Sequence, residues 1–212
     1  MGIDLDYNCR SDCLYTIQKI FPNMENISIL THDQIFGGNA KLEIKEKPEC
    51  KIENIKLVLE HYYIVGFFCA PFDKLKSVDI NCEESDYDYF NLEDAFPIFN
   101  RKCGVIFKSL NSFKFEGEDF VNKNIIDNLF DNISNMPNLV NFELKCKIKE
   151  ELKEHFYNNF IIKILSLKFI RKISISIYKN KNYKIYSKEE IIKLCPNINL
   201  DHLYNINIQH LN

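Results

Sequence analysis

The chain has 212 residues, a formal net charge of −3 and a hydrophobic share of 46%. That share is ample for a continuous core, so the composition excludes a wholly disordered chain, and the length predicts a single domain. No apolar run approaches the roughly 18 residues of a membrane-spanning helix. The first residues lack the basic and apolar segments of a signal peptide, so we expect a cytoplasmic protein.

The cysteines leave two alternatives open. Their even number is typical of disulfide-bonded domains, but we favour reduced, buried thiols because the chain lacks a secretory signal. The eight residues are Cys9, Cys13, Cys50, Cys69, Cys82, Cys103, Cys146 and Cys195.

The chain opens with a predicted helix over residues 10–21. Leu14, Ile17, Ile20 and Phe21 fall on one face of this helix, and Pro22 follows its end. We expect residues 1–23 to form an N-terminal helical cap. A short extra strand is predicted over residues 40–45.

From residue 24 onward a six-residue phrase recurs, in the order apolar, polar, polar, apolar, polar, apolar. Its clearest copy is Leu75-Lys76-Ser77-Val78-Asp79-Ile80. The alternation within the phrase predicts a strand, and intervals of 23 to 35 residues are typical of repeat architectures. The seven copies begin at Met24, Ile52, Leu75, Leu110, Leu139, Ile170 and Leu203.

Amphipathic helices are predicted between the later copies, over residues 120–134, 149–165 and 187–194. In the third of these, Ser187 and Glu190 have the spacing of a capping box. Short strands that alternate with helices predict parallel strands joined by crossovers, and therefore an α/β fold.

The seven phrases resemble the repeats of the leucine-rich-repeat family. The resemblance covers residues 24–212 and implies a short, irregular solenoid of parallel strands alternating with helices, whose strands line a concave face. On that face the resemblance places Asn54, Lys56, Ser77, Asp79, Ser112, Lys114, Asn141, Glu143, Lys172, Ser174, Asn205 and Asn207. The alternative is an ordinary α/β domain whose strands share the pattern.

The sequence has none of the motifs that would indicate an enzyme. Cys9 and Cys13 lack a second close ligand pair for zinc, and there is no nucleophile elbow or phosphate-binding loop. We therefore expect no catalytic residue, no metal and no cofactor.

One segment concentrates acidic residues without any Lys or Arg among them. It is either a solvated loop or a docking loop for a basic partner surface. Its members are Asp79, Glu83, Glu84, Asp86, Asp88, Glu93 and Asp94.

A second segment, residues 163–188, holds eight basic residues and no acidic ones. It is either a mildly basic loop or a patch that faces RNA or an acidic protein, because clustered Lys and Arg attract phosphates. Its members are Lys163, Lys168, Arg171, Lys172, Lys179, Lys181, Lys184 and Lys188.

Two functions follow from these features. The first is a non-enzymatic protein-interaction scaffold that is docked stably on a larger assembly. The alternative is an accessory protein of a ribonucleoprotein particle such as the ribosome, which contacts RNA through residues 163–188. Neither reading involves a membrane or a small-molecule substrate.

Overall fold

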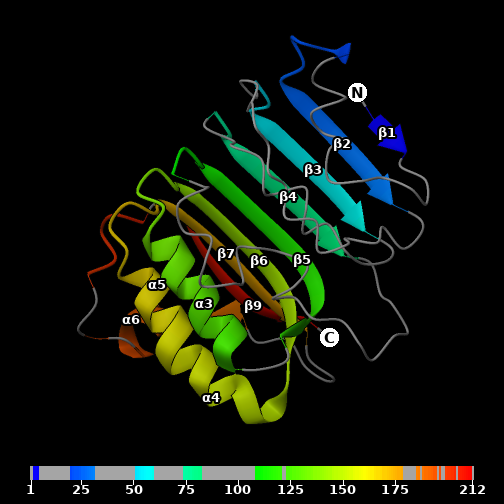
Figure 1. The fold of residues 1–212 in the computed structure, drawn as a ribbon. Helices are drawn as coiled ribbons and strands as arrows, with labels where there is room; N and C mark the ends of the chain where they lie inside the picture. The colour runs from blue at the N-terminus through cyan, green and yellow to red at the C-terminus, as the bar shows by residue number, and fades with distance from the viewer. Residues whose placement is uncertain are drawn as a thin grey trace.

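The recurring phrases fold as neighbouring strands of one sheet in the computed structural model of the chain (Figure 1). The structure describes residues 2–4, 20–31, 51–59, 74–82, 108–120, 123–178, 185–186, 188–194, 196, 199–203 and 205–211. The strands are β1 (Gly2–Asp4), β2 (Asn26–Thr31), β3 (Asn54–Leu59), β4 (Ser77–Cys82), β5 (Ser112–Phe120), β6 (Asn141–Ile148), β7 (Lys172–Tyr178), β8 (Ile185–Tyr186) and β9 (Asn205–Leu211).

The strand order is β1-β2-β3-β4-β5-β6-β7-β9-β8. Every neighbouring pair from β1 through β7 to β9 is parallel, and β8 alone pairs antiparallel, with β9. Parallel strands with helical crossovers confirm the predicted α/β class.

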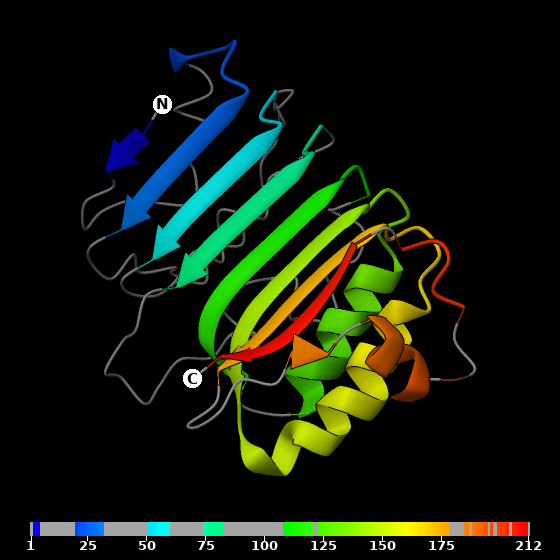
Figure 2. The same cartoon turned by 180° about the vertical axis from the view of Figure 1, so that it is seen from behind.

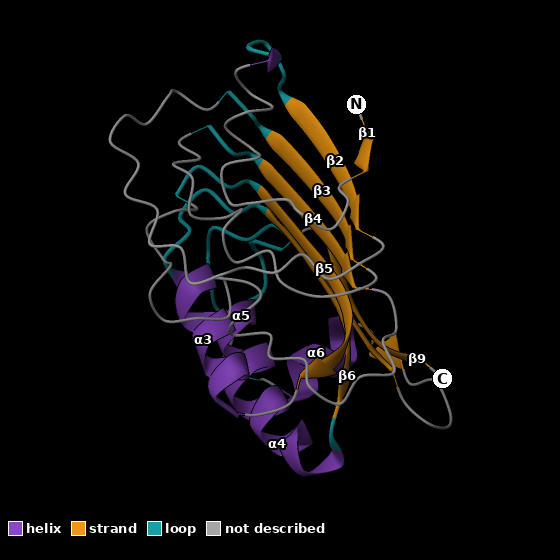
Figure 3. Ribbon diagram, turned by 45° about the vertical axis from the view of Figure 1, so that its right-hand side comes forward, coloured by secondary structure: helices purple, strands orange, loops and turns teal. Residues whose placement is uncertain are grey.

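The described helices lie on one side of the sheet, over its carboxyl-terminal half (Figure 3). They are α3 (Lys123–Ser134), a continuous helical segment over residues 150–165, and α6 (Lys188–Leu194). The 150–165 segment begins as a 3₁₀ turn (Glu150–Leu152) and continues as α4 (Lys153–His155), a π-helical stretch (Phe156–Ile161) and α5 (Ile162–Leu165). None of the helices described is long and apolar enough to cross a membrane.

The helix predictions between copies are confirmed, with one correction. We expected Phe120 to begin the first of these helices, but it is the last residue of β5, where it pairs with Ile148 of β6. A register shift between Gly117 and Asp119 allows β5 to run to nine residues, so the helix begins only at Lys123.

We expected residues 1–23 to form a helical cap, and the structure differs from this in one described element. Gly2–Asp4 is a strand, β1, that pairs with β2 at the edge of the sheet. The strand expected over 40–45, Ser187 as a helix cap, and the helix expected over 10–21, save its last two residues, lie outside the described residues.

All seven phrases stack in the same register. Their fourth residues form one row across the sheet, Ile27, Ile55, Val78, Phe113, Phe142, Ile173 and Ile206. Between phrases, the carbonyl of the second residue accepts bonds from the next phrase. For example, the Glu53 carbonyl accepts from the backbone N–H groups of Lys76 (2.7 Å) and Ser77 (3.0 Å). The same pair of backbone hydrogen bonds recurs on the carbonyls of Glu25, Lys76, Asn111 and Val140.

The apolar residues of the phrases form the core against the helices. Ile52, Leu75, Leu110, Leu139 and Ile170, each the first residue of its phrase, are fully buried. Burying such a side chain stabilises the fold by about 1.5–3 kcal/mol.

Aromatic rings join the sheet to the helical layer. Phe142 stacks on Phe113 with 6.1 Å between ring centroids and meets Phe160 of the π-helical stretch at the same separation. Phe160 in turn stacks on Phe156 at 5.0 Å. The polar positions of the phrases are thereby held on the opposite face of the sheet, which the rear view presents (Figure 2).

Candidate functional site

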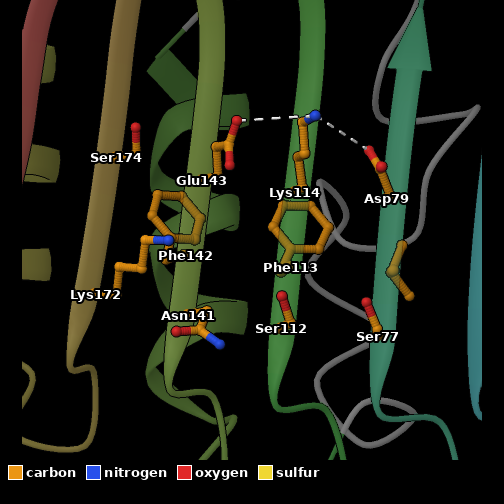
Figure 4. Close-up of a pocket in the computed structure, with 11 residues that line it drawn as sticks. Ser77, Asp79, Ser112, Phe113, Lys114, Asn141, Phe142, Glu143, Lys172 and Ser174 are labelled. Atoms are coloured by element: carbon orange, nitrogen blue, oxygen red, sulfur yellow. Dashed lines mark ion pairs between the residues drawn. The ribbon is translucent and has the colours of Figure 1, made fainter. Parts of the chain in front are cut away.

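The face of the sheet away from the described helices carries the polar residues of the phrases, and we call it the open face. Strand side chains alternate between faces, so the third and fifth residues of each phrase project here when the fourth and sixth are buried. Eight of the twelve residues predicted for a concave face line one hollow of about 200 Å³ over β4 to β7 (Figure 4): Ser77, Asp79, Ser112, Lys114, Asn141, Glu143, Lys172 and Ser174. The register places the other four, Asn54, Lys56, Asn205 and Asn207, in the same rows.

Charges alternate across the middle of the open face. The Lys114 ammonium on β5 lies 3.9 Å from a carboxylate oxygen of Asp79 on β4 and 3.9 Å from one of Glu143 on β6 (Figure 4). The three side chains are 32% to 46% exposed, so solvent screens these ion pairs and each contributes at most about 1 kcal/mol to stability.

The rows on either side are polar as well. One row further along the strands, Lys145 donates to the carboxylate of Glu116. One row earlier, the Asn54 amide donates to the Asn26 side-chain oxygen at 2.7 Å. The open face therefore presents a nearly neutral pattern of donors and acceptors on a rigid backbone.

The shape of the hollow limits what it can bind. Small-molecule sites typically enclose about 300–1,000 Å³ and are largely apolar. This hollow is smaller, and polar residues make up most of its lining, beside Val78, Phe113 and Phe142. Among the residues that the structure describes, no group of three or more His, Cys, Asp or Glu side chains is placed to hold a metal ion. The geometry suits contact with another macromolecule better than enclosure of a ligand.

The acidic segment is only partly visible. Asp79 belongs to the row on the open face, where it pairs with Lys114. Glu83, Glu84, Asp86, Asp88, Glu93 and Asp94 lie outside the described residues, so the docking-loop hypothesis stays a prediction.

The described members of the basic segment are exposed and lie where the 150–165 helix ends and β7 begins, but they face different ways. Lys163 lies in the helical layer, with its ammonium 5.2 Å from the Phe130 ring centroid. Lys172 lines the hollow on the open face, and Arg171 donates to the His202 carbonyl at 3.1 Å. Lys168 lies in the turn before β7. Lys179, Lys181, Lys184 and the Lys188 side chain are outside the described part.

One histidine, His155, has side-chain partners on both of its ring nitrogens. His155 Nε2 lies 3.0 Å from Asp127 Oδ1, and the Asn159 amide nitrogen lies 2.7 Å from His155 Nδ1. The amide is a donor, so Nδ1 accepts and Nε2–H donates to Asp127. All three side chains come from α3 and the 150–165 helix, and the arrangement joins these two helices.

The sequence analysis missed a set of bonds that fix the turns before the strands. The residue just before two of the phrases makes them: Ser109 Oγ donates to the Leu75 carbonyl and Asn138 Nδ2 to the Lys108 carbonyl, both at 2.8 Å. The signal in the sequence is the pair Pro-Asn directly before two of the phrases, at Asn23 and Asn138, because both residues favour turns.

Two cysteines are described, and both are free thiols. Burial raises the pKa of the Cys82 thiol from 9.0 to about 12 and that of the Cys146 thiol still further. Reactive cysteines have lowered pKa values, so the burial of these two thiols is typical of structural cysteines.

Comparisons of the chain with protein-family models, with curated proteins and with solved structures found no match.

Proposed function

We propose that this chain is a protein-interaction scaffold that docks on a larger assembly through the open face of its sheet. The observation that carries the proposal is the in-register pattern of polar and oppositely charged side chains across β4 to β7, which line a hollow smaller than a typical small-molecule site. Electrostatic complementarity of this kind gives specificity and register to protein interfaces.

The same proposal assigns the fold to the leucine-rich-repeat-like solenoids. Three features support this class. The seven phrases share one register, a pair of backbone hydrogen bonds recurs between successive phrases, and the described helices lie on one side of the sheet. Each repeat of a solenoid contacts chiefly its neighbours. An experimental structure whose strands were not in this sequential order would refute the assignment.

The partner is expected to carry charges that match the alternating row of Asp79, Lys114 and Glu143. A cytoplasmic location belongs to the proposal, and the two free thiols support it, because reduced cysteines persist in that compartment.

Site-specific photo-crosslinking tests the proposal in living cells. A photoreactive phenylalanine analogue is placed at Lys114 on the open face and, as a matched control, at the exposed Glu151 in the helical layer. We expect one protein to crosslink from position 114 and not from 151, and the charge reversal Lys114→Glu to weaken its binding. Crosslinking from 151 alone would refute the open face as the interface.

The alternative function is an accessory protein of a ribonucleoprotein particle that contacts RNA through residues 163–188. The observation that favours it is the exposure of all four described basic residues, with Lys163 in α5 and with Lys168, Arg171 and Lys172 at the start of β7. Charge reversal of Lys179, Lys181 and Lys184 tests it, since unchanged partner binding and unchanged salt dependence would rule it out.

A further inference from the structure

The described residues at the edge where the strands begin are strongly basic between β3 and β7. Because the strands are parallel, their amino-terminal turns lie side by side along one edge, which we call the turn edge: residues 51–53, 74–76, 108–111, 135–140 and 166–171. These residues have a formal net charge of +5, whereas the whole chain has −3. The basic members are Lys51, Lys74, Lys76, Lys108, Lys168 and Arg171, and Glu53 is the only acidic member.

The turn edge has a defined length, and hydrogen bonds join its turns. Neighbouring strands are about 4.8 Å apart, so the four spacings from β3 to β7 cover about 19 Å. The paired backbone hydrogen bonds between successive phrases fix the turns, and Ser109 and Asn138 add side-chain hydrogen bonds. Carboxylates bound the basic stretch on both sides, with Glu25 before β2 and Asp201 before β9.

Three lysines carry most of the available charge. Lys51, Lys108 and Lys168 are exposed, whereas the Lys76 ammonium lies 2.7 Å from the Glu53 carboxylate. Arg171 donates to the His202 carbonyl but keeps its charge and further N–H donors. The turn before β6 is uncharged, so Lys108 and Lys168 are two strand spacings, or about 10 Å, apart.

We propose that the turn edge binds the phosphate backbone of double-helical nucleic acid. A duplex carries one negative charge per about 1.7 Å of its axis, and lysines that neutralise phosphates release counterions. At a rise of about 3.4 Å per base pair, the basic stretch covers about six base pairs. This surface is separate from the open face and goes beyond the protein-interaction function proposed above, and it shares only Lys168 and Arg171 with the basic segment of the alternative function.

The residues of the turn edge favour a duplex over two other anionic partners. Centres of protein interfaces are enriched in aromatic residues and depleted in lysine, which is the opposite of this composition. Single strands stack their bases on exposed aromatic rings. Phe169, the aromatic residue of the turn edge, is half-buried against the core. Contact through lysine and phosphate alone predicts binding without sequence preference.

Fluorescence polarisation with a labelled 24-base-pair DNA duplex of mixed sequence tests the proposal. The test variant carries Lys51→Gln, Lys108→Gln and Lys168→Gln. The control carries Lys123→Gln, Lys147→Gln and Lys149→Gln, which removes equal charge from exposed lysines at the end where β6 stops and α3 begins. Circular dichroism and the unfolding midpoint of each variant verify that it folds.

We expect the test variant to bind at least tenfold more weakly at 0.1 M salt, and its slope of log K against log salt to be smaller by about 0.9 for each lost phosphate contact. The control should bind within about twofold of the parent chain. Equal losses in both variants would refute the turn edge as the site. Tighter binding of polyglutamate, of a single strand or of phosphatidylserine vesicles than of the duplex would overturn the proposed ligand. None of these results depends on crosslinking from Lys114, so the two proposals fail separately.

Discussion

The substitution Gly117→Ala tests the packing of the longest strand. Gly117 lies in β5 just before the register shift. A Cβ atom at this position would lie 2.8 Å from Cζ and 2.9 Å from Cε1 of Phe115, closer than van der Waals contact allows. The Phe115 ring is 1% exposed, so its neighbours restrict any movement away from the new methyl group.

The expected cost is the difference between two terms. Overpacking a well-filled core costs about 1–3 kcal/mol. Alanine in a strand regains about 0.5–1 kcal/mol of the conformational entropy that glycine loses on folding. We therefore expect Gly117→Ala to lower the free energy of unfolding by about 1–2 kcal/mol, measured by urea denaturation with the m-value unchanged.

A double-mutant cycle identifies the cause. Phe115→Leu removes the ring atoms that the new Cβ would meet, so the double variant should be more stable than the sum of the single variants predicts by about 1 kcal/mol. Additivity within about 0.5 kcal/mol would show that the methyl group and the ring do not compete for space, and the packing argument would be wrong.

Three further predictions follow from the ion pairs, the thiols and the helix contact. Lys114→Met should change the free energy of unfolding by less than about 1 kcal/mol, because its two ion pairs are exposed, and a larger loss in thermal unfolding would contradict this. The raised pKa of Cys82, about 12 against 9.0, means that the folded state holds a proton that the unfolded state loses above pH 9. The contribution of this thiol to the free energy of unfolding should therefore be constant well below pH 9 and fall above it by up to about 1.4 kcal/mol per pH unit, so the fall should be shallower in Cys82→Ala. His155→Ala should cost about 1–3 kcal/mol in chemical denaturation, since it removes bonds to Asp127 and Asn159, whereas Glu154→Ala at the exposed neighbouring position should be nearly neutral.

The sequence predicted the strands well because their signal is local and repeated. Val78 and Ile80 alternate with Ser77 and Asp79, and a shift of one residue would expose the apolar pair to solvent. The register of all seven phrases follows from that constraint. The strands that were not predicted, β1 and β8, have three and two residues, too few to show a period.

The sequence predicted which residues lie on the open face, but it did not predict the ion pairs and hydrogen bonds between them. The position of Lys114 in its phrase predicts the face on which it lies. Its pairing with Asp79 and Glu143 depends on residues 35 and 29 positions away in the chain, which become neighbours only when the strands align. The bond from Ser109 to the Leu75 carbonyl depends on the same alignment. The π-helical turn at Phe156–Ile161 likewise depends on packing, because its sequence has an ordinary helical pattern.

The two proposed surfaces differ in how their charges are arranged, and that difference predicts how each responds to salt. On the open face Lys114 already has carboxylate neighbours on both adjacent strands, so a partner exchanges existing ion pairs for new ones and gains chiefly specificity. At the turn edge the exposed Lys51, Lys108 and Lys168 lie on alternate turns, before β3, β5 and β7, and carry charge of one sign. Binding there releases counterions, so affinity for a duplex falls steeply with salt, whereas affinity for a protein on the open face falls little. If one partner engaged both surfaces, its salt dependence would be set by the turn edge and its specificity by the open face.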